Sequence, residues 1–542
     1  MDYSSGELIF YFLVASALSV LGAWLLAWRF RAAMRLLMSR AVPARTTARP
    51  EPPPFTPQPA PIDVSAADNR RAGWRLATLL IGLSILIAIS SAALQLALMR
   101  ENLLTPARTL TLAFVFLWPV IPALAQMWRW SRLRTIGVLM LWCLVAFAVI
   151  LWRQVEPQPG QAMVFLASEI GPTILLVALL CMGNVTRAIA PLILLPLFIL
   201  VWALFAGVDA LELFITEYSS RLSAWASLFD SLSSTLLQLL LVVVFLAVPC
   251  LLVWWPVKWL SRRLAAAYTR QWLSELMILF AALWGIALFA RMLGWVTTLG
   301  FGAVVMLAPL LWIPVVMLLL RRLRRSGGRA PTLLVLRVFQ RDRAMRALFD
   351  NVIEHWRLSG NTVLIAGTDL LDRTLDADDI FTFLDGRLAE RFISSVEQIP
   401  ARLAQFELEP DAEGRYRINE CYCHDTTWRE TLAALLERSD VVLMDLRSFQ
   451  RRNEGCSFEL GELARAPGLS RVVLLTDAQT DLSAAQQTVA AAPAGRFVWL
   501  DATHMNRERR REVLNALFGT TGARPAIPLA PANVDCAAAA RE

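Results

Sequence analysis

The chain has 542 residues, of which 57% are hydrophobic and 18% charged, with a net charge of +8 and a mean hydropathy of +0.52. An ordinary soluble domain has about 25% charged residues, and a disordered chain has far fewer apolar ones. The charge also divides unevenly: residues 1–329 carry 27 basic and 13 acidic side chains (net +14), and residues 330–542 carry 25 and 31 (net −6). These numbers predict a basic, apolar membrane domain followed by an acidic, water-soluble domain, and they exclude a nucleic-acid partner as the reason for the positive charge.

The first 329 residues contain repeated apolar stretches of the length needed to cross a bilayer, about 20 residues each. We expect an α-helical bundle of about nine spans: 8–28, 76–98, 109–127, 135–152, 162–182, 188–207, 232–255, 273–293 and 299–320.

The distribution of basic residues between these spans predicts their orientation, because cytoplasmic loops of membrane proteins are enriched in Lys and Arg. With the N-terminus outside, the loops assigned to the inside (29–75, 128–134, 183–187, 256–272 and 321–329) hold 22 basic residues. The outside holds five: Arg100, Arg108, Arg153, Arg221 and Arg291. The longest outside loop is then 208–231. We therefore expect a multi-pass protein of a bacterial inner (cytoplasmic) membrane, with the N-terminus outside and the C-terminal domain in the cytoplasm.

Two features of the membrane domain invite a functional interpretation. The cytoplasmic segment 43–61 is rich in proline and should be an extended linker. Glu169 is an intramembrane acid followed by Gly171 and Pro172, a pair that interrupts a helix. Glu169 is therefore either part of a proton or cation site, as in a transporter with a regulatory cytosolic domain, or a structural acid hydrogen-bonded within the bundle. The absence of an internal repeat weighs against a secondary transporter.

From residue 330 the pattern changes to short apolar strands that alternate with amphipathic helices. Such alternation predicts a cytosolic α/β domain over 330–520 with a mainly parallel sheet covered on both faces, followed by a disordered tail at 521–542. The expected strands are 332–339, 361–367, 416–423, 440–446, 471–477 and 496–502, and the expected helices are 342–358, 378–405, 426–438, 455–466, 480–491 and 506–518.

Ligands of open α/β sheets bind beyond the carboxyl ends of the strands. Five charged residues follow those ends in this chain and are the expected ligand-binding or catalytic groups: Arg341, Asp369, Asp445, Arg447 and Asp477. No Gly-rich dinucleotide motif and no Walker A loop follows a strand, which disfavours dinucleotide redox chemistry and P-loop chemistry. Cys421, Cys423 and His424 lie close together, but a fourth ligand is not evident, so no metal site is expected.

The most specific motif follows the fourth expected strand. Cys456-x-x-Glu459-Leu460, with Ser448 upstream, resembles the WCxxEL signature of TIR domains, although Gly455 stands where those domains have Trp. Gly455-x-x-x-Glu459-Leu460-Gly461 is also similar to an element of nucleoside 2-deoxyribosyltransferases. Both families have flavodoxin-like sheets, and in both the corresponding Glu acts on an N-glycosidic bond, so either resemblance implies a flavodoxin-like fold here.

The resemblance implies a role for each of the residues near this motif. Glu459 would stabilise or trap the positive charge that develops on the ribose when the bond to the base breaks, and Asp445 would bind a ribose hydroxyl. Arg341 or Arg447 would hold phosphates. NAD or another nucleotide would be the substrate or ligand, with no resident cofactor, and because TIR domains assemble with one another, a homo-oligomer through the membrane and TIR-like parts is compatible with this reading. In the alternative, Glu459 is an exposed helix acid and the chain is a non-catalytic membrane signalling or scaffold protein.

Overall fold

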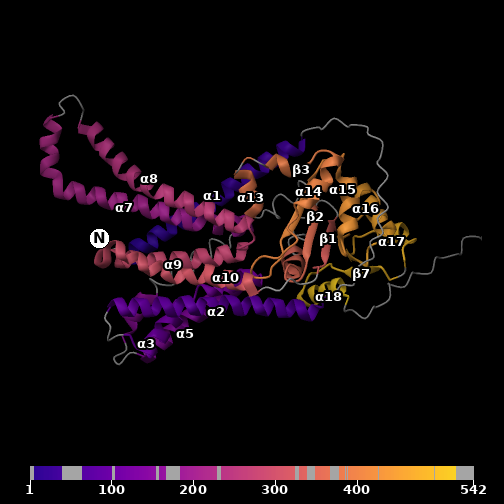
Figure 1. Cartoon of the computed structure of the whole chain (residues 1–542), viewed down its shortest axis with the longest axis horizontal. Coiled ribbons are helices and arrows are strands. Elements are labelled where there is room, and N and C mark those ends of the chain that lie inside the picture. The colour runs from indigo at the N-terminus through magenta and orange to yellow at the C-terminus, as the bar shows by residue number, and fades with distance from the viewer. Residues whose placement is uncertain are drawn as a thin grey trace, which may run out of the picture.

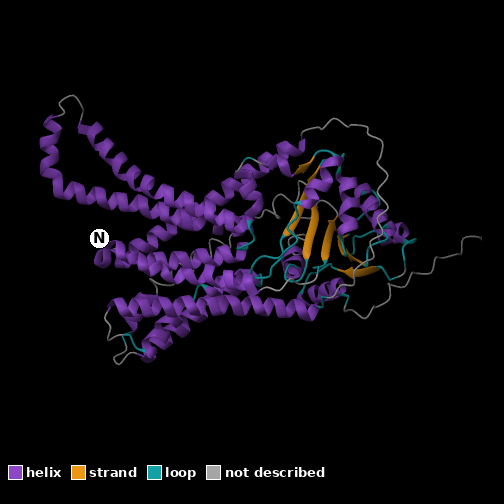
Figure 2. Cartoon of the chain, in the orientation of Figure 1, coloured by secondary structure: helices purple, strands orange, loops and turns teal. Residues whose placement is uncertain are grey.

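The computed structural model describes residues 5–39, 64–99, 104–153, 158–166, 184–228, 234–323, 329–337, 348–366, 377–384, 386, 388–424, 426–493 and 495–519. Long helices occupy one end of the molecule, and a sheet with shorter helices occupies the other (Figures 1 and 2). This arrangement confirms the division into a helical part and an α/β part.

The helical part is built from elements whose composition suits a bilayer. Within the described ranges, seven helices are long and apolar enough to cross a membrane, or eight if the bent pair α3 and α4 is one span. The fifth predicted span, 162–182, lies mostly outside the described residues. The helices are α1 (Ser5–Ser39), α2 (Ala66–Met99), α3 (Pro106–Phe116), α4 (Val120–Met127), α5 (Arg132–Arg153), α7 (Asn184–Leu228), α8 (Ser234–Thr269) and α9 (Glu275–Leu299), and then the 3-10 helix η2 (Gly300–Leu311), which continues into α10 (Trp312–Leu323).

Burial distinguishes the central helix of this bundle from a peripheral one. In the apolar stretch of α9, 78% of the residues are buried, whereas in that of α8 only 6% are. Helices α7 and α8 form a long hairpin (Figure 1), and they approach so closely that a Cβ atom at Gly207 would overlap the carbonyl group of Phe245. The predicted outside loop 208–231 is helical up to Leu228, because α7 continues through that residue, and its assignment to the outside stays a prediction.

The α/β part has a seven-stranded sheet in which every neighbouring pair is parallel. All six predicted strands are present, together with a two-residue edge strand, β3, that the sequence did not indicate. The order is β3-β4-β2-β1-β5-β6-β7, and the strands are β1 (Thr332–Arg337), β2 (Asn361–Ala366), β3 (Phe392–Ile393), β4 (Ile418–Cys423), β5 (Val441–Asp445), β6 (Arg471–Thr476) and β7 (Phe497–Asp501).

This strand order corrects the expectation of a flavodoxin-like sheet. The six long strands, counted along the chain, follow the order 3-2-1-4-5-6, whereas flavodoxin-like sheets follow 2-1-3-4-5. Both orders are doubly wound, and both place a topological switch point beside the first strand. In this chain the switch point lies between β1 and β5, where Arg337 and Asp445 are paired in register.

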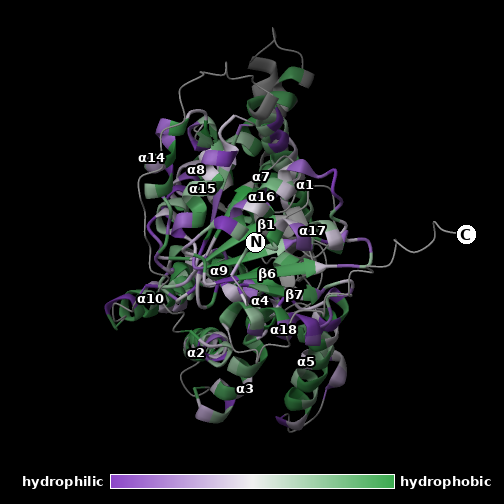
Figure 3. Cartoon of the chain, turned by 90° about the vertical axis from the view of Figure 1, so that its right-hand side faces the viewer, coloured by the Kyte–Doolittle hydropathy of each residue, from purple (hydrophilic) through white to green (hydrophobic). Residues whose placement is uncertain are grey.

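Helices cover both faces of the sheet, as the apolar strands require. One face packs against η3 (Phe349–Ile353), α12 (Glu354–Trp356) and α18 (Arg507–Phe518), with Trp356 stacked on Phe518 at 4.8 Å. The other face packs against α14 (Ile399–Ala404), α15 (Trp428–Arg438), α16 (Glu454–Arg465) and α17 (Leu482–Val489). Figure 3 shows hydrophobic strands β1 and β6 in the middle, flanked by helices such as α14 and α18 that carry hydrophilic residues.

The predicted helix 378–405 is wrong as a single element. The chain there forms α13 (Ala377–Leu384), the 3-10 turns η4 (Leu388–Arg391) and η5 (Val396–Gln398), strand β3 and helix α14. Gly386 has a φ of 72°, a left-handed conformation that cannot continue a right-handed helix.

The hydrophobic core of the first sheet face continues into the helical bundle. Phe30 of α1 contacts Phe383 of α13 edge to face, with ring centroids 5.8 Å apart, and buried side chains of α1, α7 and α9 belong to the same apolar cluster as those of β1 and β5. The two parts of the chain therefore share one core rather than being joined by a linker alone.

Candidate functional site

The carboxyl end of β5 carries two of the predicted site residues, and they bind each other. Arg447 donates from Nη2 to Asp445 Oδ2 at 2.6 Å and from Nε to Oδ1 at 2.8 Å, and both side chains are less than a tenth exposed. Arg447 Nη1 also donates to the carbonyl of Ala502, just beyond β7, at 3.4 Å. A bidentate pair of this kind fixes the loop after β5. It also means that the Arg447 guanidinium is already paired with the carboxylate of Asp445.

Asp477, at the end of β6, organises the neighbouring loop. Its Oδ1 accepts the backbone N–H of Ser448 at 2.8 Å and the hydroxyl of Thr480 at 2.9 Å. Ser448 has a φ of 63°, in the left-handed region that residues other than Gly, Asn and Asp seldom adopt. The carboxylate therefore holds the loops after β5 and β6 together at the switch-point edge of the sheet.

Glu459 lies on the buried face of α16 rather than on its solvent face. Its side chain is 6% exposed, beside Cys456, Leu460 and Leu463, which are 2% exposed or less. The alternative in which Glu459 is an exposed helix acid is therefore wrong. A carboxylate this deeply buried must be stabilised by neighbouring polar groups, so the packing of the fold determines its position.

Three predicted site residues fall outside the described residues: Arg341 (in 338–347), Asp369 (in 367–376) and Glu169 (in 167–183). The structure therefore brings Asp445, Arg447 and Asp477 together at one edge and gives no geometry for the other three. In the described ranges no group of three or more His, Cys, Asp or Glu side chains could hold a metal ion.

A second cluster, which the sequence did not indicate, lies where the bundle meets the α/β part. Glu354 of α12 accepts from Arg129 at 2.7 Å, from Arg357 at 3.2 Å and from Arg415. Glu275, the first residue of α9, lies 3.5 Å from Arg357 and 3.9 Å from Arg415. Arg129 and Glu275 come from the helical part and the other three from the α/β part. We call these five residues the ionic junction.

Arg417 extends this contact along the end of α8. Its guanidinium lies 3.9 Å from the ring centroid of Tyr268 and donates to the Tyr268 carbonyl, to Asp411 Oδ1 at 2.9 Å and to Glu407 at 2.5 Å. The Tyr268 hydroxyl donates to Glu275 at 3.2 Å. A single polar network thus ties the ends of α8 and α9 to the segment that leads into β4.

Other contacts between the two parts use the same end of the bundle. Ser359 donates to Asn69 of α2 at 2.8 Å, and Gln271 donates to the carbonyl of Glu409 at 3.3 Å. Asn69, Arg129, Tyr268 and Gln271 all belong to loops that the charge distribution assigned to one side of the membrane. Their common contact with the α/β part agrees with that assignment of sides, while the direction relative to a particular membrane stays a prediction.

The pKa values of titratable groups in and next to the ionic junction are shifted in different directions. Burial alone would raise the pKa of Glu354, but the neighbouring Arg129, Arg415 and Arg357 outweigh it and hold that pKa well below its usual range. Burial, reinforced by the nearby charge of Asp411, raises the pKa of Glu413 to about 7. Burial also lowers the pKa of His355 to about 4.

Arg291 is a charged residue inside the bundle that the topology prediction had assigned to the outside. It lies within α9, is 7% exposed, and its guanidinium stacks on the ring of Phe116 at 3.5 Å. Phe116 ends α3 immediately before the 44° bend into α4. Charged residues buried in a span are rare and often functional. The sequence prediction assigned Arg291 to the outside because it lies only a few residues from the predicted end of its span.

The chain matches no known family model, and neither a curated protein nor a solved structure matches it.

Proposed function

We propose that the chain is a membrane signalling protein of the cytoplasmic membrane, in which the α/β domain binds a small nucleotide and passes its state to the helical bundle. The observation that supports this proposal is the ionic junction. Buried charge pairs require their partners in register, because a displaced partner leaves an uncompensated charge. A shift of the α/β domain must therefore be accompanied by a shift of α9, whose apolar stretch is the most buried of the seven candidate spans that the structure describes.

In this proposal the nucleotide binds at the switch point between β1 and β5. Asp445, Arg447 and Asp477 gather there, and doubly wound sheets bind their ligands at this position. Because Asp445 and Asp477 fix the loops after β5 and β6, a ligand that contacts those loops would act on groups already held in place.

The test uses the full-length protein in lipid nanodiscs, with NAD, ATP and GTP as probes. We expect at least one probe to raise the thermal unfolding midpoint and to slow hydrogen exchange both in the loops after β5 and β6 and at residues 268–275. In Arg415→Met the slowing at the loops should remain and that at 268–275 should disappear. Arg465→Met, which removes an exposed ion pair with Glu462, is the matched control. If no probe shifts the midpoint, or if wild-type protection stays confined to the α/β domain, the proposal fails.

A second candidate function is cleavage of an N-glycosidic bond in NAD or a related nucleotide by Glu459. The observation that favours it is the burial of this carboxylate, which belongs to the motif that resembles TIR domains and deoxyribosyltransferases. In the reaction water adds its oxygen to the anomeric carbon, the bond to the base breaks, and the base leaves while a proton is released. The carboxylate stabilises the positive charge that develops on the ribose.

This candidate predicts a specific loss of activity. Glu459→Gln keeps the side-chain shape but removes the charge, so release of free base from NAD should fall by roughly 10²–10³-fold, the usual effect of removing one transition-state contact. Glu462→Gln, at a partly exposed acid of the same helix that pairs with Arg465, should retain wild-type activity. The measurement is chromatographic detection of base with the purified full-length protein. Equal rates for wild type and Glu459→Gln would exclude the glycosidase.

A further inference from the structure

Three tryptophans and an arginine contact one another in a row where α2 meets the loop between α4 and α5. Trp74 of α2 contacts Trp128 edge to face, with ring centroids 5.6 Å apart, and Trp128 stacks on Trp130 at 5.9 Å. The guanidinium of Arg134, in the first turn of α5, lies 4.4 Å from the ring centroid of Trp130. Among the described residues, no other tryptophan rings contact each other. We call these four residues the Trp–Arg cluster.

The Trp–Arg cluster lies where helices of the bundle leave their apolar stretches. Each of its members is within a few residues of the end of a predicted span, namely 76–98, 109–127 or 135–152. Trp74 is 65% exposed. Tryptophan concentrates at the level of lipid headgroups, because its ring is apolar and its N–H group is polar. The exposed side of the cluster should therefore lie in the headgroup layer.

The positive charge at this cluster has no acidic partner. Among the described residues, no carboxylate forms an ion pair with Arg134, or with Arg75 and Arg132, which neighbour the cluster in sequence. Stacking on Trp130 occupies only one face of the Arg134 guanidinium. The N–H groups in the plane of that guanidinium therefore remain available for the oxygens of a phosphate.

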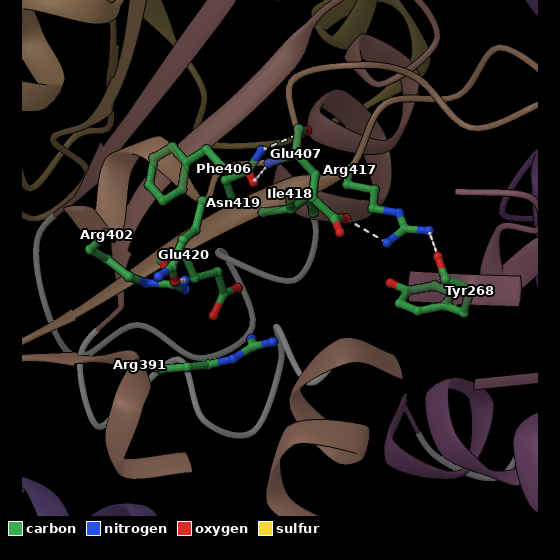
Figure 4. Close-up of a pocket in the computed structure, with 10 residues that line it drawn as sticks. Tyr268, Arg391, Arg402, Phe406, Glu407, Arg417, Ile418, Asn419 and Glu420 are labelled. Carbon is green, nitrogen blue, oxygen red and sulfur yellow. Dashed lines mark hydrogen bonds and ion pairs between the residues drawn. The ribbon is translucent and has the colours of Figure 1, made fainter. Parts of the chain in front are cut away.

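The charge of the other arginine cluster at this end of the bundle is already neutralised. Figure 4 shows Arg417 bound to the carbonyl of Tyr268, in a pocket that Arg391 and Arg402 also line. Three carboxylates stand against these three arginines: Glu407 and Asp411, which both bind Arg417, and Glu420, which lines the pocket. That pocket offers no net charge to an anionic headgroup, whereas the Trp–Arg cluster does.

Residues adjacent to the Trp–Arg cluster hold the α/β part. Arg129, between the two tryptophans of the loop, binds Glu354 at 2.7 Å, and its φ of 50° lies in the left-handed region. Gly73, next to Trp74, is buried, and a Cβ atom there would lie 3.4 Å from the side chain of Leu358. The loop and α2 thus contact the same short segment of the α/β part, at positions next to those that form the cluster.

We propose that the Trp–Arg cluster binds the headgroup of an anionic phospholipid, with Arg134 on the phosphate and the tryptophan rings against the glycerol backbone. A lipid fits better than a free phosphate because three apolar rings accompany the one arginine of the cluster. A bound headgroup would contact residues on both sides of Arg129, which belongs to the ionic junction. The binding itself does not depend on the proposed signalling function, so each can fail without the other.

The test uses the full-length protein in nanodiscs of phosphatidylcholine mixed with phosphatidylglycerol, followed by native mass spectrometry of the lipids that the released protein retains. The wild type should retain phosphatidylglycerol in preference to phosphatidylcholine. Arg134→Lys keeps the charge but loses the planar fork of N–H groups, so the preference should fall by roughly fivefold to tenfold. The matched control Arg132→Lys, in the same turn of α5, should keep the wild-type preference. Equal preferences in the two variants would mean that only general attraction to basic residues acts, and the proposal would fail.

Hydrogen exchange in residues 128–134 gives a second readout that does not depend on lipid release. Exchange should slow when phosphatidylglycerol is added to phosphatidylcholine nanodiscs, in the wild type and Arg132→Lys but not in Arg134→Lys. Both arginines are exposed, so neither variant should change the thermal unfolding midpoint in detergent. Displacement of the lipid by soluble glycerophosphoglycerol would identify a site for a free phosphodiester, and equal retention of both lipids would identify an aromatic site for choline. Either result would overturn the proposal.

Discussion

Replacing Glu354 with alanine is expected to lower the free energy of unfolding of the full-length protein by roughly 3–5 kcal/mol. Three guanidiniums meet at this carboxylate, from Arg129, Arg357 and Arg415, and the Arg357 and Arg415 side chains are less than a tenth exposed. Without Glu354 they remain buried with only Glu275 as a junction carboxylate. The cost therefore comes from the positive charges left behind more than from the lost bonds.

The measurement is denaturant unfolding in detergent micelles, compared with Glu462→Ala. Glu462 forms an exposed ion pair with Arg465 on the same helix at 2.7 Å, and exposed pairs contribute roughly 0–1 kcal/mol. Equal destabilisation by the two substitutions would mean that the junction does not hold the two parts of the chain together. Replacing Glu354, Arg129 and Arg415 together by apolar residues should be less damaging than Glu354→Ala alone, because it leaves fewer unpaired charges.

Protonation of Glu413 should stabilise the protein by up to about 3 kcal/mol, because a pKa of about 7 lies roughly 2.5 units above its ordinary value, and each unit is worth about 1.4 kcal/mol. The folded state holds this proton while the unfolded state has lost it, so stability falls as the pH rises from about 4.5 to about 7. His355 acts in the opposite direction. Its pKa of about 4 makes the folded state release a proton that the unfolded state keeps until pH 6.5, so stability rises with pH over that interval.

The two effects overlap, so the experiment compares wild type with Glu413→Gln at each pH from 5 to 8. The wild type should lose stability relative to the variant across this range, with most of the change complete by about pH 7.5. Asp411 and Arg415 face the same group. Because the ionisation of Asp411 depends on that of Glu413, the difference between the two proteins reports the titration of this pair of acids. A stability difference that does not change with pH would show that Glu413 is ionised in the folded protein throughout.

The sheet was predictable from the sequence because parallel strands buried on both faces must be almost continuously apolar. Val441–Asp445 and Arg471–Thr476 show this pattern and were placed within one or two residues. The two-residue strand β3 is too short to give any periodicity, and the predicted helix around it was broken by the left-handed Gly386. The strand order was not predictable, because it depends on which side of β1 each later strand joins.

The candidate site was only partly predictable, for a related reason. Proximity to strand ends singled out Asp445, Arg447 and Asp477, yet it could not show that Asp445 and Arg447 would bind each other. The ionic junction was missed because its members come from four separate segments, and no local pattern relates Arg129 to Glu354. Arg129 contributes to the sequence argument only as one of the basic residues of loop 128–134, since a sequence does not reveal which charged side chains become buried.

The helices α7 and α8 are far longer than a bilayer requires. At 1.5 Å per residue, the 45 residues of α7 extend about 67 Å, and the hydrocarbon core is about 30 Å thick. One end of this hairpin contacts α13 of the α/β part and the other end lies far from it (Figure 1), so in a bilayer we expect the far end to emerge on the opposite side. With that topology the protein would be exposed to two aqueous compartments, and an antibody or protease supplied to either one would reach a different part of the same polypeptide.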